Sequence, residues 1–183
     1  MKISIYLANL ACYTEGRENG RWLTLPMEAT KLEKVIDEIV GKNQEHIILD
    51  YSAPFEISEF ENVVELNKFM GSVEDCGLEE NELKAIFKVA DTKEEAMKKI
   101  ENGEFTLINV DEVIEGWSTC IIDDDTLGLV LNETGYNTLF RQSVPEEMID
   151  YIDWDGIYRD LAINDGWQHI RVAGNDYLIT LKF

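Results

Sequence analysis

The aspartates that stand close together in this sequence are the side chains most suited to binding a metal ion. Asp123–Asp125 are consecutive, and Asp153–Gly156 has the order Asp-Trp-Asp-Gly, as in part of a calcium-binding loop. Carboxylate oxygens are the ligands that hard cations such as Ca²⁺ prefer. However, aligning Gly156 with the invariant glycine of such a loop puts Tyr151 and Ala162 at the first and last ligand positions. Both positions need oxygen ligands, so the spacing does not predict a calcium site.

Other catalytic groups are sparse. The two histidines are His46 and His169, and the three cysteines, Cys12, Cys76 and Cys120, are widely separated. The sequence contains no HExxH, no glycine-rich phosphate loop, no GxSxG and no CxxC pair. A Cys–His dyad assembled in space stays open, but no motif favours it. We therefore expect free thiols, no cofactor and no resident metal, and we interpret the chain as a non-enzymatic protein.

Negative charge is the largest signal in the composition. The 183 residues include 37 Asp and Glu against 16 Lys and Arg, a net charge of −21. The excess is −4 over residues 1–60, −6 over 61–104 and −11 over 105–183. With 45% hydrophobic residues the composition is that of a globular protein. The acidic side chains therefore cover a folded surface, which either serves solubility or attracts proteins with basic clefts while repelling nucleic acid.

Hydrophobic periodicity predicts the elements that carry these charges. The expected strands are 3–7, 21–25, 45–51, 105–110, 167–172 and 177–183. The expected helices are 32–39, one opened by a Ser58–Glu61 capping box and ended by Gly71, 78–90, 92–103, 127–132, one with Pro145 at its first position, and 154–162. Residues 111–122 receive no assignment.

This order of elements predicts an α+β fold in three small domains. Residues 1–57 would form a sheet with one helix, residues 58–104 a helical domain, and residues 105–183 a mixed α and β domain. The apolar stretch at the N-terminus is too short for a signal sequence, and no run approaches the roughly 20 apolar residues of a membrane span. We therefore expect a soluble, cytoplasmic protein without membrane contact.

Several segments at both ends of the chain together match a known family. They are Tyr6–Leu10 with Tyr13 and Glu15-Gly16, Trp22–Pro26, Asp50–Phe55, Glu133–Gly135, Val144-Pro145, Tyr151–Trp154 and Arg159–Leu161. These segments resemble the ArdA antirestriction proteins, in which Asp50–Phe55 corresponds to D-Y-x-x-P-F, and they run in the family's order. Residues 61–104 are similar only in their helical, acidic character, and Tyr158 stands where members usually carry Gly before Arg-Asp-Leu.

The resemblance implies an elongated, three-domain protein that dimerises and imitates B-form DNA. Members of the family occupy the DNA-binding groove of type I restriction–modification enzymes and are typically carried by mobile genetic elements. We expect no direct binding of this chain to nucleic acid, because its negative charge repels it. Carboxylates would replace the phosphates that supply the sequence-independent part of DNA affinity. A dimer, with twice the charge of one chain, would match the phosphates of about 21 base pairs.

On this interpretation the site residues fall into two groups. The candidate phosphate mimics are Glu61, Glu65, Glu79, Glu80, Glu82, Glu94, Glu95, Asp111, Glu112, Glu115, Asp123, Asp124, Asp125, Glu146 and Glu147. The candidates for the dimer contact or the antirestriction segment are Tyr151, Asp153, Trp154, Tyr158, Arg159 and Asp160. The aromatic members of this second group could instead pack inside the third domain.

Two rival functions stay open at this point. An acidic adaptor or anti-repressor could use the same decoy surface against another DNA-binding protein. A metal-dependent enzyme could be built on Asp123–Asp125 together with Asp150, Asp153 and Asp155. Competition with DNA without any effect of divalent ions would favour the decoy, and stabilisation by metal without competition would favour the enzyme.

Overall fold

A computed structural model describes residues 1–17, 19–42, 44–117, 121–136 and 145–182. Cys120, Val144 and the last residue of the strand expected at 177–183 lie outside these ranges. The chain folds as two compact units, one of residues 1–83 and 92–97 and the other of residues 84–91 and 98–183. Each unit contains helices and a three-stranded antiparallel sheet. The predicted α+β class is confirmed, and the division into three domains stays a prediction.

The first unit is built on a sheet with the strand order β2-β1-β3. Its strands are β1 (Ile3–Asn9), β2 (Gly20–Leu25) and β3 (His46–Ser52), close to the predicted ranges. Alternation decides which face is buried. Ile3, Ile5 and Leu7 are buried, whereas Tyr6 lies on the other face in edge-to-face contact with Trp22. The short helix α1 (Leu10–Thr14) follows β1.

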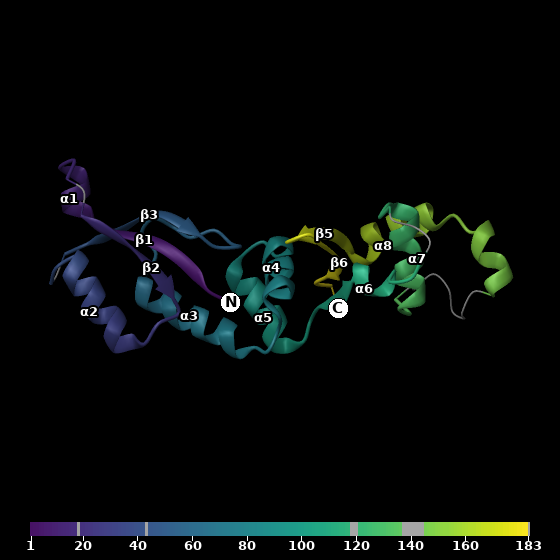
Figure 1. Cartoon of the computed structure of the whole chain (residues 1–183), viewed down its shortest axis with the longest axis horizontal. Coiled ribbons are helices and arrows are strands. Elements are labelled where there is room, and N and C mark those ends of the chain that lie inside the picture. The colour runs from purple at the N-terminus through teal and green to yellow at the C-terminus, as the bar shows by residue number, and fades with distance from the viewer. Residues whose placement is uncertain (18, 43, 118–120, 137–144, 183) are drawn as a thin grey trace. The chain divides into compact units, whose positions relative to one another are not determined.

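Two helices lie on one side of this sheet, α2 (Ala29–Ile39) and α3 (Val63–Asp75) (Figure 1). Leu32 of α2 and Leu66 of α3 are buried, as helical spacing predicts. The side chain of Asn67 fixes α3 to the segment before α2. Its Oδ1 accepts a hydrogen bond from Met27 N at 2.8 Å, and its Nδ2 donates to Met27 O at 2.9 Å.

The predicted bounds of α3 were wrong at both ends. Ser58 and Glu61 do form a local turn, in which Glu61 Oε2 accepts from Ser58 N at 3.3 Å, but no helix starts there. Asn62 is the actual cap, accepting hydrogen bonds from Val64 N and Glu65 N. Gly71 lies inside the helix, because a lone glycine weakens a helix by about 1 kcal/mol without ending it. Gly77, at φ +80°, follows the true end.

Two further helices, α4 (Glu80–Val89) and α5 (Lys93–Asn102), contribute residues to both units. The helix expected over 92–103 is confirmed as α5, and Thr92 caps it, because Thr92 Oγ1 accepts from Glu95 N at 3.1 Å. As predicted, residues 58–103 contain helices and no strand.

The second unit is organised around β6 (Asn175–Thr180), which lies between β4 (Thr106–Asn109) and β5 (Gln168–Val172). Leu178 belongs to the core that also contains residues of α7 (Asp124–Glu133) and α8 (Trp154–Asp165). Tyr177 packs instead with Ala85 of α4. Successive residues of a strand face opposite sides, so β6 is covered on both faces, which explains its run of apolar residues.

The structure assigns the first part of the region that the sequence left unassigned. The short helix α6 (Val110–Val113) follows β4 directly. The two expected C-terminal strands are confirmed as β5 and β6, which form a hairpin with Ala173 and Gly174 both at positive φ in its turn. The expectation for Pro145 was wrong by one position. It caps a short 3₁₀ helix, η1 (Glu146–Tyr151), because its ψ of 140° is extended.

Candidate partner-binding surface

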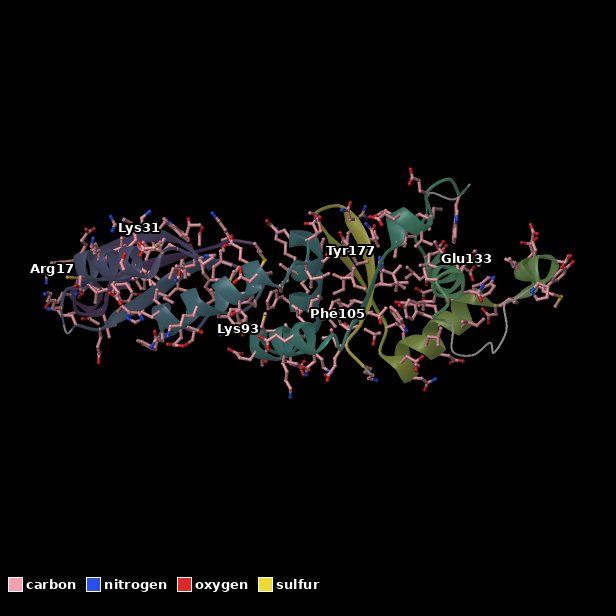
Figure 2. All side chains as sticks on the ribbon, turned by 90° about the horizontal axis from the view of Figure 1, so that it is seen from below. Arg17, Lys31, Lys93, Phe105, Glu133 and Tyr177 are labelled. Atoms are coloured by element: carbon pink, nitrogen blue, oxygen red, sulfur yellow. The ribbon has the colours of Figure 1, made fainter. Side chains whose placement is uncertain are left out.

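Carboxylates cover the surface of both units. In the described part of the chain, Asp176 is the only Asp or Glu that is buried. By sequence, the first unit holds 8 basic and 19 acidic residues, a net charge of −11, and the second holds 8 and 18, a net charge of −10. Figure 2 shows oxygen-tipped side chains along the outside of both units. The negative field therefore belongs to each unit and not to one acidic segment.

Some of the predicted phosphate mimics of the first unit are paired with lysine. Lys93 Nζ lies 2.8 Å from Glu61 and 3.2 Å from Glu94, and Lys68 Nζ lies 2.8 Å from Glu65. Burial lowers the pKa of Lys93, but its hydrogen bonds and ion pairs with Glu61 and Glu94 outweigh burial, so the pKa is raised overall. Glu61 is the most enclosed of these carboxylates, since its side chain is only 19% exposed.

The carboxylates at the start of α4 and α5 lie on helix N-termini. Glu82 Oε2 accepts from Glu79 N at 2.8 Å, the arrangement of a capping box. Glu79 and Glu80 are exposed, while Glu82 and Glu95 are half-buried. Negative charge near a helix N-terminus is favoured by the helix dipole, so these positions suit acidic side chains.

In the second unit, the carboxylates around α6 differ in role. Asp111 Oδ2 accepts from the backbone N of the buried Asp176 at 2.7 Å, and Glu112 accepts from the side chain of Asn109 at 2.8 Å. Glu112 and Glu115 are exposed, as are Glu146 and Glu147 in the first turn of η1. Asp111 therefore contributes to the fold, and the exposed four remain candidates for partner contact.

The aspartate run at 123–125 begins helix α7. Asp123 caps the helix by accepting from Thr126 N at 3.0 Å and Thr126 Oγ1 at 2.9 Å. These hydrogen bonds lower the pKa of Asp123. Asp125 Oδ1 accepts from Asp155 N, at the start of α8, at 2.8 Å. Across the described ranges, no three His, Cys, Asp or Glu side chains gather in a way that could hold a metal ion.

The two histidines also have structural partners. His46 Nε2 lies 2.9 Å from the backbone oxygen of Glu61. His169 Nε2 lies 2.7 Å from Oδ1 of the buried Asp176, and Arg171 Nε lies 3.5 Å from its other oxygen. The two contacts of Asp176 join β5 to β6 in the C-terminal hairpin.

The second group of predicted residues divides between core and surface. Trp154 and Tyr158 are 6% and 9% exposed. Both side chains therefore pack inside the chain, which was the alternative to a dimer contact. Trp154 Nε1 donates to Ile149 O at 2.9 Å, and burial, followed by the charge of Asp124, raises the pKa of Tyr158. Tyr151 is 83% exposed. Of the three aromatic residues, Tyr151 is therefore the one most open to a second chain.

The polar members of that group lie at the start of α8 and on its surface. Asp153 caps the helix by accepting from Gly156 N at 2.9 Å. Arg159 forms an ion pair with Asp155 one turn earlier, and Asp160 is exposed. Desolvation raises the pKa of Asp155 against the opposing effect of Arg159.

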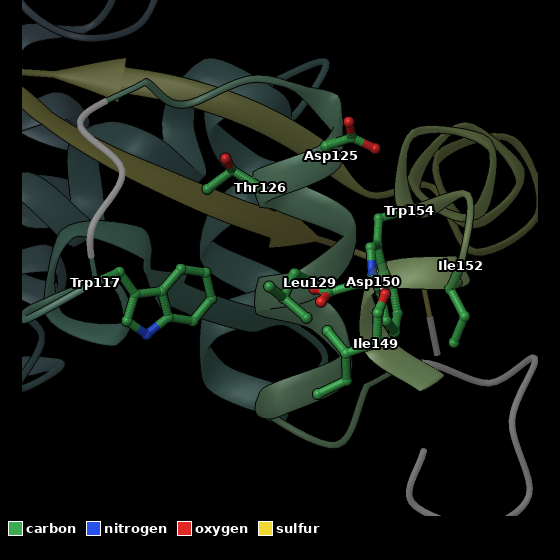
Figure 3. A pocket seen from close by; sticks show the side chains of 8 residues that line it. All are labelled: Trp117, Asp125, Thr126, Leu129, Ile149, Asp150, Ile152 and Trp154. Carbon is green, nitrogen blue, oxygen red and sulfur yellow. Dashed lines mark hydrogen bonds between the residues drawn. The ribbon is translucent and has the colours of Figure 1, made fainter. Parts of the chain in front are cut away.

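A cleft that the sequence did not predict opens where α7, η1 and α8 meet. Its volume is about 290 Å³, and Figure 3 shows its lining side chains. They are Trp117, Asp125, Thr126, Leu129, Ile149, Asp150, Ile152 and Trp154. Trp117 comes from the segment without an assignment, and tertiary packing brings it near the others. An aromatic residue beside acidic runs was the one signal that could have indicated it.

Comparison with known proteins identifies the relatives of this chain. Residues 5–173 match the family model described as Antirestriction protein (ArdA). Among curated proteins, none matches the chain. Of the helices in the described ranges, none is long and apolar enough to cross a membrane.

Proposed function

Because this chain belongs to the ArdA family of antirestriction proteins, we propose that it inhibits type I restriction–modification enzymes by occupying their DNA-binding groove as a mimic of DNA. It acts by binding and not by catalysis, as a cytoplasmic decoy encoded by a mobile element. The observation that carries the proposal is the spread of exposed carboxylates over both units, with net charges of −11 and −10.

The charge of each unit is on the scale of a short DNA duplex. Duplex DNA carries one phosphate charge per roughly 1.7 Å of helix axis, so ten charges correspond to about 5 base pairs. Proteins that bind DNA neutralise its phosphates with Lys and Arg, and this contact supplies most of the sequence-independent affinity. A folded acidic surface offers the same groove the same kind of contact.

Local hydrogen bonds hold part of this charge in place. Asp123 and Asp153 are fixed as helix caps, and Asp125 is fixed by the backbone of Asp155. A carboxylate that is already ordered loses less conformational entropy when a partner binds it. In contrast, Glu65 and Glu94 are partly neutralised by lysine within the chain, so we rank them below the exposed Glu146 and Glu147 as partner contacts.

The proposal is tested by competition with DNA for a purified type I enzyme. The wild type should displace duplex DNA from the enzyme and inhibit cleavage in the same concentration range. A protein that leaves DNA binding unchanged would contradict the mimic mechanism.

Two double variants of equal charge separate position from net charge. Glu146→Gln with Glu147→Gln removes exposed carboxylates, whereas Glu65→Gln with Glu94→Gln removes carboxylates that lysines already neutralise. The first double variant should weaken inhibition more than the second, because it removes carboxylates that are exposed to the partner. Each exposed ion pair with the partner contributes roughly 0–1 kcal/mol. Equal losses would show that only total charge matters.

A further inference from the structure

The cleft of the second unit combines aromatic walls with negative charge. In Figure 3, Trp117 and Trp154 lie on opposite sides of it, with Leu129 and Ile149 between them. Trp154 is held in place by its hydrogen bond to Ile149 O, and Trp117 packs against the core of the unit. The aromatic surfaces are thus fixed by the fold and do not depend on a ligand for their position.

Two carboxylates complete the lining. Asp125 belongs to the first turn of α7, where the backbone of Asp155 fixes its Oδ1, and Asp150 belongs to η1. None of the eight lining residues in the described part of the chain is basic. The nearby Arg159 forms its ion pair with Asp155, which does not line the cleft. The cleft therefore attracts a cation from outside, because its own lining carries negative charge and no basic side chain.

We propose that this cleft receives the guanidinium group of an arginine from the DNA-binding surface of the partner enzyme. The inference rests on the proposed function for the source of the arginine, and on the cleft itself for the chemistry. A volume of about 290 Å³ lies at the lower end of the roughly 300–1,000 Å³ of small-molecule sites. That size suits one side chain entering from a partner.

Arginine fits the lining better than lysine does. Its planar guanidinium stacks on aromatic faces, is only weakly hydrated, and can donate several hydrogen bonds to carboxylates in a fixed geometry. A cation over an indole gains more as it is desolvated. The ammonium of lysine is strongly hydrated and acts as a point charge, so it gains less from walls of tryptophan.

The direct test uses N-acetyl-arginine amide as a probe of the isolated protein, with the indole N–H signals of its four tryptophans followed by NMR. The signals of Trp117 and Trp154 should shift and saturate, and Trp22, in the first unit, should not. N-acetyl-lysine amide has the same charge and should bind more weakly. Equal shifts at Trp22, or equal binding of the lysine probe, would overturn the proposal.

A matched pair of variants tests the carboxylate. Asp150→Asn should weaken binding of the arginine probe by up to about fivefold, the factor expected for one exposed charge pair. Glu133→Gln, an exposed residue at the far end of α7, removes the same charge and should leave binding unchanged. Equal losses in both variants would overturn the cleft as a specific site.

Inhibition assays with the same variants separate the two proposals. Asp150→Asn should inhibit a type I enzyme less well than Glu133→Gln does. If the wild type inhibits and the two variants do so equally, the role of the cleft is wrong and the mimic mechanism stands. If the probe binds as expected but the wild type fails to inhibit, the cleft stands as an arginine site and the proposed function is wrong.

Discussion

Gly128 shows how one residue sets the position of the candidate site. A Cβ atom at this position would lie 2.2 Å from the carbonyl oxygen of Trp154, so only glycine allows α7 to approach α8 this closely. The same approach brings Asp125 to the backbone of Asp155. The close packing of α7 on α8 beside the cleft thus depends on the absence of a Cβ atom at position 128.

We expect Gly128→Ala to destabilise the second unit by about 1–3 kcal/mol, the usual effect of overpacking. Gly71→Ala is the matched control, because no heavy atom of the described residues beyond its own helix backbone lies within 4 Å of that Cβ. It should be neutral or stabilise the chain by up to about 1 kcal/mol. Urea unfolding followed by tryptophan fluorescence measures both. Equal effects would contradict the close contact seen at Gly128.

At the scale of the element, side-chain caps decide where the acidic helices begin. Asn62 caps α3, Asp123 caps α7 and Asp153 caps α8, each by accepting a backbone hydrogen bond within the first turn. The caps therefore serve two purposes, because the carboxylates at 123 and 153 also add negative charge to the surface. A carboxylate that accepts hydrogen bonds from backbone donors is ordered by them.

Asp123→Ala should cost about 0.5–2 kcal/mol of stability at pH 7, the usual range for a lost cap. Because hydrogen bonds from Thr126 lower the pKa of Asp123 in the folded chain, its ionisation stabilises the fold above the pKa of the unfolded state. This contribution disappears as the pH falls through the lowered pKa. Asp123→Asn keeps an acceptor and should remain near the wild type at neutral pH. Thermal unfolding of the wild type and Asp123→Ala at several pH values tests this. A difference in stability that stays constant with pH would contradict the assignment.

For the whole molecule, the distribution of charge matters more than any single carboxylate. Both units are strongly negative, and most carboxylates of the described residues reach the surface. Charges separated by more than a Debye length, roughly 10 Å at 0.1 M salt, are largely screened from one another. Affinity for a basic groove should therefore arise from many local contacts.

The dissociation constant for a type I enzyme should rise steeply with ionic strength, as it does for DNA itself. Release of counterions from the two charged surfaces is the physical reason. Binding measured from 50 to 200 mM salt, roughly the range in which DNA affinities fall by orders of magnitude, would test this. A flat dependence is incompatible with an electrostatic mimic.

We also expect the chain to form a homodimer through the surface around Tyr151, which is 83% exposed. An exposed aromatic residue offers uncharged contact area to a second acidic chain. Tyr151→Glu should therefore dissociate the dimer in analytical ultracentrifugation. Tyr13→Glu changes a residue of the first unit that is 51% exposed and should remain dimeric. A wild type that is monomeric at micromolar concentration would remove the dimer from the proposal.

The sequence by itself determined the elements and the charge. Alternation in residues 3–7 and helical spacing in 32–39 predicted β1 and α2, because both patterns are local and report which face is buried. It did not determine where helices begin and end. Gly71 and Pro145 were assigned from their general preferences, but neighbouring residues decide which side chain or backbone conformation satisfies the exposed N–H groups.

Only the tertiary structure decided which acidic and aromatic residues meet. Trp154 and Tyr158 could have formed an interface or a core, and packing of α8 places them inside. Trp117 and Asp150 are far apart in sequence, yet they line one cleft with Trp154. Another such contact joins α7 to α8, where Gly128 lies against the backbone of Trp154. Such contacts between distant residues leave no periodic signal in the sequence.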